Sequence, residues 1–107
     1  MHERDLQSRC IDWVKKQDIY IINNHGDAWG GKGKPDLVMC IAGRFVAAEI
    51  KVGSNGLSSA QRLHKKWIEK NDGIFISPYT LDEFIGQIEK IQRGGVSDEL
   101  QIHSSQR

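Results

Sequence analysis

The sequence predicts an α/β domain in which a mixed four-stranded sheet is flanked by helices, in the order α-β-β-β-α-β-α. The chain has 107 residues, the size of one domain, and 38% of them are hydrophobic, which supports one modest core. Apolar residues recur with helical spacing in three segments and form short strand-like runs in four others. Because no internal repeat or linker is found, residues 1–95 are expected to form one domain and residues 96–107 a frayed polar tail.

The first predicted helix covers residues 2–17. Four apolar residues repeat along one face of it: Leu6, Cys10, Trp13 and Val14. Glu3 extends this apolar stripe by one more turn. A carboxylate on a face that packs against the core is costly unless something neutralises it, so Glu3 needs an explanation other than packing.

Three strands are predicted next. Residues 19–22 are β-branched and aromatic, and residues 23–34 are rich in glycine and polar residues, which indicates a strand and then a loop. A second strand is predicted over residues 36–41 and a third over residues 44–52. Since only the turn at residues 42–43 separates them, the second and third strands are expected to form a hairpin.

A second helix is predicted over residues 58–70. Ser58 and Gln61 fit the S-x-x-Q capping box at its start, and Gly73 is expected to cap its end. Four residues fall on one face of this helix: Ala60, Leu63, His64 and Trp67.

The chain is expected to continue with a strand at residues 74–76 and a last helix that ends at Gly94-Gly95. Thr80 and Glu83 predict a second capping box at the start of this helix. Five apolar residues form its buried stripe: Leu81, Phe84, Ile85, Ile88 and Ile91.

Composition excludes some classes of protein. No apolar run approaches the ~20 residues that span a bilayer, and the N-terminus lacks a secretory signal, so we expect a cytoplasmic protein. Cys10 and Cys40 have neither the spacing of a zinc site nor that of a redox pair, and both are expected to be buried free thiols.

The net charge of +1 does not by itself indicate a nucleic-acid-binding protein. The cations are nevertheless grouped, and a local basic face on a neutral protein is compatible with phosphate binding. Five of them are candidate DNA contacts, two in the glycine-rich loop and three on the second helix: Lys32, Lys34, Arg62, Lys65 and Lys66.

The third strand, RFVAAEIKV, carries the strongest chemical signal. Because side chains alternate along a strand, Glu49 and Lys51 project side by side from one face. Counting outward from the turn at residues 42–43 pairs Asp36 with Glu49, which places their Cβ atoms ~5 Å apart. Two carboxylates at that distance repel each other unless a cation lies between them.

Only oxygen ligands converge at this point, which favours Mg²⁺ or Mn²⁺ over zinc. A divalent ion bound by Asp36 and Glu49 would neutralise a scissile phosphate and lower the pKa of a bound water. Lys51 would hold the attacking water or stabilise the developing charge, and Glu3 could complete the metal shell directly or through water. The pattern therefore indicates phosphodiester hydrolysis.

Other interpretations remain open at this point. A solvated sheet face carries a Glu and a Lys two residues apart without any function. An unrelated ligand-binding domain could use Asp36, Glu49 and Lys51 as a structural ion-pair cluster. The chain could also be a non-catalytic DNA-binding or assembly module that keeps a nuclease fold.

The ordered set of residues resembles the PD-(D/E)XK nuclease superfamily and, within it, the virus-type replication-repair nuclease (VRR-NUC) domain. The resemblance covers residues 3 to about 90. It depends on an early Glu in a helix, the segment G-K-P-D-L, the segment E-I-K-V-G, and L-S-S-A-Q at the start of a helix. It implies a restriction-endonuclease-like fold and a Mg²⁺- or Mn²⁺-dependent DNA endonuclease.

The resemblance also implies a role for each matching residue. Asp36 and Glu49 would be metal ligands, with the Ile50 carbonyl as a possible third. Lys51 would be the catalytic lysine, and Glu3 the acid supplied by the first helix. By the same resemblance, Gln61 would orient the lysine or the substrate.

Single-domain members of this branch are similar to Holliday-junction resolvases, which implies branched DNA as substrate, a homodimer and a stand-alone phage-like protein. A dimer suits a two-strand cut because two-fold symmetry supplies two equivalent sites. Larger members carry extra DNA-binding domains, so substrate choice in this chain is expected to come from the core fold and its dimer.

Overall fold

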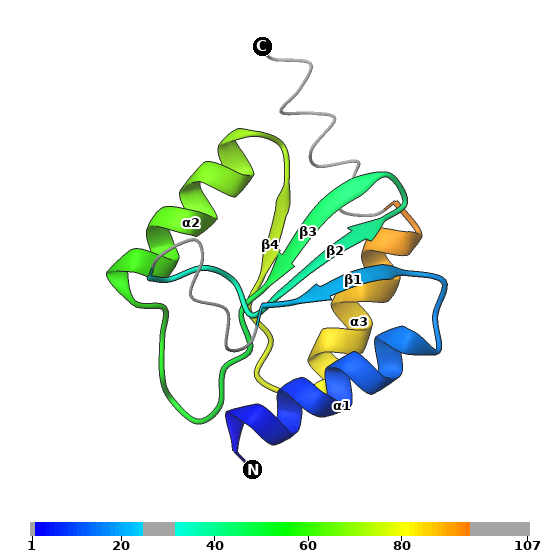
Figure 1. Cartoon of the computed structure of the whole chain (residues 1–107), viewed down its shortest axis with the longest axis horizontal. Coiled ribbons are helices and arrows are strands. Elements are labelled where there is room, and N and C mark those ends of the chain that lie inside the picture. Colours follow the sequence, from blue (N-terminus) through cyan, green and yellow to red (C-terminus); the bar gives the residue numbers. More distant parts are fainter. Residues whose placement is uncertain (1, 25–31, 95–107) are drawn as a thin grey trace.

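The structure, a computed structural model, describes residues 2–24 and 32–94 (Figure 1). The elements follow the predicted order: α1 (Glu3–Lys15), β1 (Tyr20–Asn23), β2 (Leu37–Ile41), β3 (Arg44–Ala48), α2 (Ser59–Lys70), β4 (Ile74–Ile76) and α3 (Leu81–Gln92). The predicted tail at residues 96–107 lies outside the described residues. Among the described residues, no helix is both long and apolar enough to cross a membrane.

The four strands form one mixed sheet in the order β1-β2-β3-β4, which confirms the predicted architecture. β1, β2 and β3 pair antiparallel, and β4 adds to β3 in parallel after the α2 crossover. Figure 1 shows α1 and α3 together near the β1 end of the sheet, whereas α2 flanks the β4 end.

The hydrophobic core lies where α1 and α3 pack against the sheet. β2 and β3 contribute alternate residues, and the helices contribute one stripe each, as the periodicity predicted. The fully buried members include Leu37, Met39, Val46, Ala48, Cys10, Val14, Phe84, Ile88 and Ile91. Trp13 of α1 packs edge to face on Phe84 of α3, with 6.1 Å between ring centroids. This contact, together with the apolar side chains of α1 that are buried in the same core as β2 and β3, fixes the position of α1 relative to the sheet.

β3 is shorter than the predicted strand over residues 44–52 and ends at Ala48. On its β4 side the backbone pairing continues, because the Glu49 and Lys51 amides donate to the Ile76 and Pro78 carbonyls. On its β2 side the Ile50 amide donates instead to the Asp36 carboxylate. Beyond Ala48, therefore, a hydrogen bond to the Asp36 side chain takes the place of the backbone hydrogen bonds between β2 and β3.

The predicted helix caps are confirmed in part. Ser58 and Gln61 form both bonds of the capping box on α2. At the other end of α2, the Gly73 amide donates to the Ile68 carbonyl at 2.8 Å, as expected of a capping residue, but the left-handed conformation falls on Asp72, at φ 67°. Gly73 is needed for a different reason, because a Cβ there would lie 2.7 Å from the Ile68 Cγ2 atom.

The predicted second capping box, on α3, is only half formed. The Thr80 hydroxyl accepts a hydrogen bond from the Glu83 amide, but the Glu83 carboxylate accepts from the Tyr79 amide, one residue before the box position. At the C-terminal end, Gly94 has φ 82°, in agreement with its predicted role as the stop of this helix.

Two burial predictions need correction. Cys10 is buried, but Cys40 is exposed, because it lies on the face of β2 opposite α1 and α3; both are free thiols. On α2, Ala60 and His64 are half-buried, whereas Leu63 and Trp67 are each 54% exposed. The helical spacing correctly placed these residues on one face, but only part of that face contacts the described protein.

Candidate metal and active site

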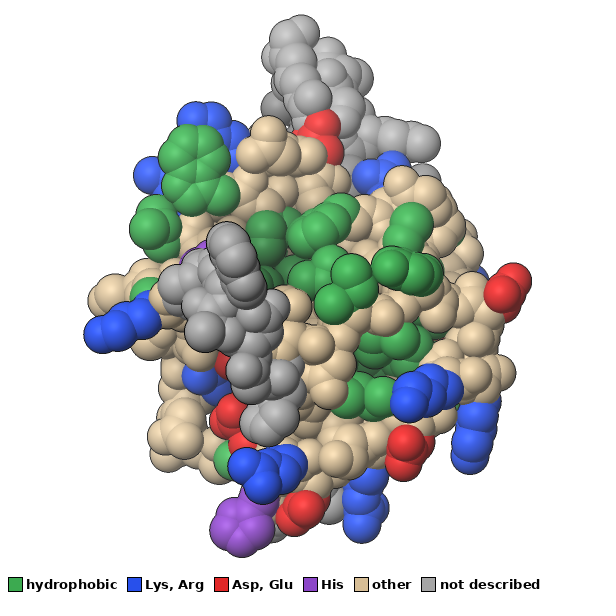
Figure 2. Space-filling view, viewed as in Figure 1, with side chains coloured by type: hydrophobic (Ala, Val, Ile, Leu, Met, Phe, Trp, Pro, Cys, Tyr) green, Lys and Arg blue, Asp and Glu red, His purple; other side chains and the backbone are tan. Residues whose placement is uncertain are grey.

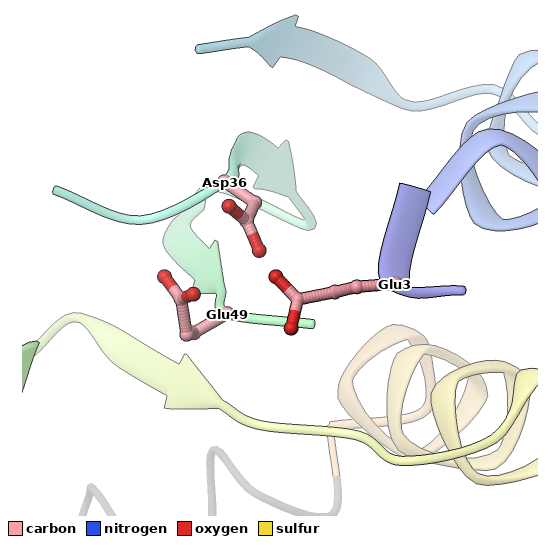
Figure 3. Close-up of side chains that lie close together, drawn as sticks. All are labelled: Glu3, Asp36 and Glu49. Atoms are coloured by element: carbon pink, nitrogen blue, oxygen red, sulfur yellow. The ribbon is translucent and has the colours of Figure 1, made fainter. Parts of the chain in front are cut away.

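Three carboxylates meet at the end of the β2–β3 hairpin. One oxygen each from Glu3, Asp36 and Glu49 lies within 4.8 Å of the others, and Figure 3 shows the three side chains pointing toward one another. Glu3 comes from the first turn of α1, Asp36 from the residue before β2, and Glu49 from the residue after β3. The structure therefore brings together the three acids that the sequence singled out.

Strand register places Asp36 opposite Glu49. Leu37 pairs with Ala48 as the outermost pair of the hairpin, so the next position outward joins Asp36 and Glu49, as counting from the turn predicted. Asp36 is further held through its Oδ2 atom, which accepts the Ile50 amide at 2.8 Å. Its side chain is thus attached to the strand that carries Glu49.

The loop before Asp36 is tied to the end of β1 by one residue that the sequence did not single out. The Asn24 side-chain amide donates to the Pro35 carbonyl at 2.9 Å, and the Asn24 backbone amide donates to the Asp36 carbonyl at 2.9 Å. Pro35 itself is buried. These contacts fix the approach of Asp36 to the cluster, and an Asn in a glycine-rich segment gives no sequence signal of this role.

The packing of α1 brings Glu3 to the site. Leu6 is buried in the core, and the Gln7 side chain donates to the Asn23 Oδ1 atom of β1 at 3.1 Å. The N-terminal turn of a helix favours a negative charge. Burial, followed by the charge of Asp36, nevertheless raises the pKa of Glu3, and Lys51 opposes this shift. The negative charge of Asp36 therefore acts directly on the Glu3 carboxylate.

Glu49 is the most enclosed of the three acids, with 3% of its surface exposed. Burial first, and then the charge of Asp36, raise its pKa to about 8, while Lys51 acts in the opposite direction. Its Oε2 atom accepts the Gln61 side-chain amide at 3.0 Å. Its Oε1 atom is buried and has no hydrogen-bond partner among the described residues.

Lys51 and Gln61 complete the site. Lys51 is 8% exposed, and its Nζ atom donates to the Gln61 Oε1 atom at 2.9 Å. The same oxygen accepts the Ser58 backbone amide at 2.8 Å, which is one bond of the α2 capping box. Gln61 therefore bridges Lys51 and Glu49 while its own position is set by the start of α2. The capping box was predicted from the S-x-x-Q pattern, and the contact with Lys51 lies where the resemblance implied that Gln61 would orient the lysine.

The five predicted DNA-contacting cations lie on the segment before β2 and on α2. The backbone at Gly33 runs directly against α2, since a Cβ there would lie 2.5 Å from the Ala60 carbonyl carbon, and the His64 Nε2 atom lies 3.1 Å from the Lys32 carbonyl oxygen. The structure therefore brings the loop that carries Lys32 and Lys34 beside the helix that carries the other three. On α2, Arg62 donates to the Leu57 carbonyl and Lys65 pairs with Glu69 at 2.7 Å.

Comparison with known proteins bears on this arrangement. No sequence-family model matches the chain, and no curated protein matches it. Among solved structures, a protein described as "VRR_NUC domain protein" superposes with a TM-score of 0.72 and 24% sequence identity, and the match covers 84% of this chain and 87% of that chain. The chain has the VRR-NUC fold. This finding confirms the restriction-endonuclease-like architecture expected from the sequence.

Within this fold, the donor set suits a hard divalent cation. All three converging side chains are carboxylates, and hard cations such as Mg²⁺ and Mn²⁺ prefer oxygen ligands. The Glu49 Oε1 atom has no hydrogen-bond partner in the described part of the chain, and such an atom is costly to bury without a donor or a cation. A cation between the carboxylates would satisfy this atom and remove the mutual repulsion that raises the pKa of Glu49.

The raised pKa of Glu49 predicts how stability depends on pH without metal. Glu49 binds its proton more tightly in the folded chain, with a pKa of about 8, than in the unfolded chain, where the ordinary value is 4.5. The resulting stabilisation is complete below pH 4.5 and is lost as the pH rises through about 8. In EDTA, the free energy of unfolding is therefore expected to fall by a few kcal/mol between pH 5 and 9, at about 1.4 kcal/mol per pKa unit.

The measurement is chemical denaturation at several pH values, with Glu49→Gln as the control. Glu49→Gln is expected to flatten the decline, and Mg²⁺ is expected to restore the stability of the wild type at high pH. A wild-type free energy of unfolding that stays constant or increases from pH 5 to 9 in EDTA would refute the raised pKa of Glu49.

Proposed function

We propose that this chain is a Mg²⁺- or Mn²⁺-dependent nuclease that hydrolyses phosphodiester bonds in DNA. The observation that carries the proposal is the convergence of Glu3, Asp36 and Glu49 within 4.8 Å, on a VRR-NUC fold. Lys51 and Gln61 adjoin this cluster through direct hydrogen bonds to each other and to Glu49. A set of acids alone would support only cation binding, whereas the adjacent lysine adds a group that can stabilise an anionic transition state.

Asp36 and Glu49 are the proposed metal ligands, with Glu3 acting directly or through water and the Ile50 carbonyl as an additional oxygen. A divalent ion held there would neutralise the scissile phosphate and promote ionisation of a water molecule. The Asp36 carboxylate keeps its orientation because its Oδ2 atom accepts a hydrogen bond from the Ile50 amide.

Lys51 is the proposed catalytic residue. Its ammonium group would donate a hydrogen bond to a phosphate oxygen or to the attacking water, and this bond would strengthen as negative charge accumulates on the phosphate. Gln61 restricts where the ammonium group can lie, since it accepts one Lys51 N–H and donates to Glu49. Preorganisation of this kind lowers the cost of orienting the lysine during the reaction.

Branched DNA is the favoured substrate and a homodimer the favoured assembly in this proposal. Both are extended from the resemblance of the sequence to the VRR-NUC domain, in which single-domain members are similar to junction resolvases. Lys32, Lys34, Arg62, Lys65 and Lys66 would contact DNA phosphates from the loop and from α2. The rival function is a DNA-binding or assembly module without catalysis, and the cleavage experiment separates the two.

Cleavage by wild type and Lys51→Ala tests the catalytic proposal. Labelled four-way junction, duplex and single-stranded DNA are incubated with Mg²⁺, Mn²⁺ or EDTA and resolved on a denaturing gel. We expect metal-dependent cutting, stronger on branched DNA than on continuous duplex, and a decrease of about 100-fold or more in Lys51→Ala, the size of a lost transition-state contact. DNA binding without cutting in either metal would instead support the non-catalytic module.

A second prediction concerns the hydrogen bonds that position Gln61. The Ser58 hydroxyl accepts a hydrogen bond from the Gln61 backbone amide. Ser58→Ala removes this bond and so loosens Gln61, the residue that holds Lys51. Thr80→Ala removes the equivalent hydroxyl from α3, which accepts the Glu83 amide. Each substitution should cost about 1 kcal/mol of stability, the usual contribution of a helix N-cap.

Only Ser58→Ala is expected to slow cleavage, by several-fold in kcat and with little change in KM. Both variants are assayed well below their unfolding temperatures, so that lost stability alone cannot reduce the rate. Equal rates in the two variants would show that the α2 cap contributes stability and nothing to the position of Lys51.

A further inference from the structure

The outer face of α2 carries an open groove lined by Leu57, Arg62, Lys65, Lys66, Glu69 and Lys70. Four of these side chains are cationic and one is acidic. Lys65 and Glu69 pair with each other, which leaves the excess positive charge on Arg62, Lys66 and Lys70. In Figure 2, blue side chains and hydrophobic side chains lie together over α2, at the upper left of the molecule.

The three remaining cations form a row. Arg62, Lys66 and Lys70 are spaced four residues apart, so they follow one another along the helix at about 6 Å per step. The whole chain has a net charge of only +1, and this row is therefore a local concentration of positive charge. An extended polyanion such as a nucleic-acid backbone matches a row of this kind better than a compact anion does.

Trp67 lies beside the row with 54% of its surface exposed. An exposed tryptophan is unusual, because this side chain is highly buried on average. Lys70 connects Trp67 to the groove. The Lys70 side chain lines the groove, and its Nζ atom lies 4.8 Å from the centroid of the Trp67 ring. Leu63, one turn earlier, is exposed to the same extent.

A basic track beside an exposed aromatic ring is the combination by which proteins bind single-stranded nucleic acid. The cations follow the phosphates, and the ring stacks on a base that is free of its own partners. A base within a continuous duplex is already stacked on both sides and does not offer a face to Trp67. The chemistry of α2 therefore favours unpaired nucleotides over continuous duplex.

α2 also leads directly from the candidate site. Gln61, in its first turn, contacts both Glu49 and Lys51, and Trp67 follows six residues later, roughly 9 Å along the helix axis. We propose that α2 binds a single-stranded segment of the substrate next to the cleavage point, with one unpaired base stacked on Trp67. This inference rests on the proposed nuclease function and narrows its substrate to DNA that carries unpaired nucleotides beside the cut.

Fluorescence anisotropy with a labelled single-stranded oligonucleotide and its duplex tests the proposal. The titrations are done in EDTA, so that they do not depend on cleavage. We expect Trp67→Ala to weaken single-strand binding about ten-fold and duplex binding much less, and Trp67→Phe to restore most of the loss. Lys66→Ala should weaken both and reduce the salt dependence of binding by about one phosphate contact.

Tyr20→Ala is the matched control, because Tyr20 is 68% exposed but lies on β1, at the opposite edge of the sheet from β4 and α2. This variant should bind both oligonucleotides as the wild type does. The proposal is overturned if Trp67→Ala leaves single-strand binding unchanged, weakens both oligonucleotides equally, or changes the oligomeric state measured by light scattering. If binding depends on Trp67 but no metal supports cleavage, the nuclease proposal fails while the single-strand site is retained.

Discussion

The register of the β2–β3 hairpin is the constraint on which both the core and the candidate site depend. It buries Leu37 and Ala48 against the helices, and one position further out it sets Asp36 opposite Glu49. A shift of one residue would turn every buried side chain of one strand to the other face of the sheet. The same shift would separate the two acids, so the register that buries the core also sets Asp36 opposite Glu49.

The fold stabilises a cluster that is unfavourable by itself. Glu49 is nearly inaccessible and lies close to two other carboxylates, and its raised pKa records this strain. The Ile50 amide, the Gln61 side chain and the Lys51 ammonium group offset part of the negative charge. They do not reach the Glu49 Oε1 atom, which has no hydrogen-bond partner among the described residues. Strongly shifted pKa values of this kind, caused by burial together with a neighbouring charge, cluster at functional sites.

The sequence predicted those parts of the molecule that follow from local periodicity. Alternation along β3 and the short turn at residues 42–43 were sufficient to pair Asp36 with Glu49, because hairpin geometry is fixed by chain connectivity. The S-x-x-Q pattern predicted the cap of α2 for the same reason. Glu3 was harder to place, since its approach depends on how α1 packs, and only its unusual position on an apolar stripe revealed it.

Predictions failed where tertiary contacts decide the outcome. Helical spacing groups Leu63 and Trp67 with Ala60 but cannot show that the sheet covers only one side of that face. β3 ends early because the Asp36 side chain takes the hydrogen bond of the next strand position, which is a long-range contact. Gly73 was expected to cap α2, but the left-handed residue is Asp72, and Gly73 also leaves room for the Ile68 side chain.

The most direct test of the candidate site is Mn²⁺ binding by isothermal titration calorimetry, combined with the stability of the metal-free proteins. The wild type is compared with Asp36→Asn and with Glu69→Gln, which changes an exposed acid in the groove on α2. If the carboxylates hold a cation, Asp36→Asn should weaken Mn²⁺ binding at least ten-fold and leave the metal-free protein equally or more stable, and Glu69→Gln should leave Mn²⁺ binding unchanged. Unaltered Mn²⁺ binding together with a marked loss of stability in Asp36→Asn would contradict this, and would identify the cluster as a structural ion-pair network.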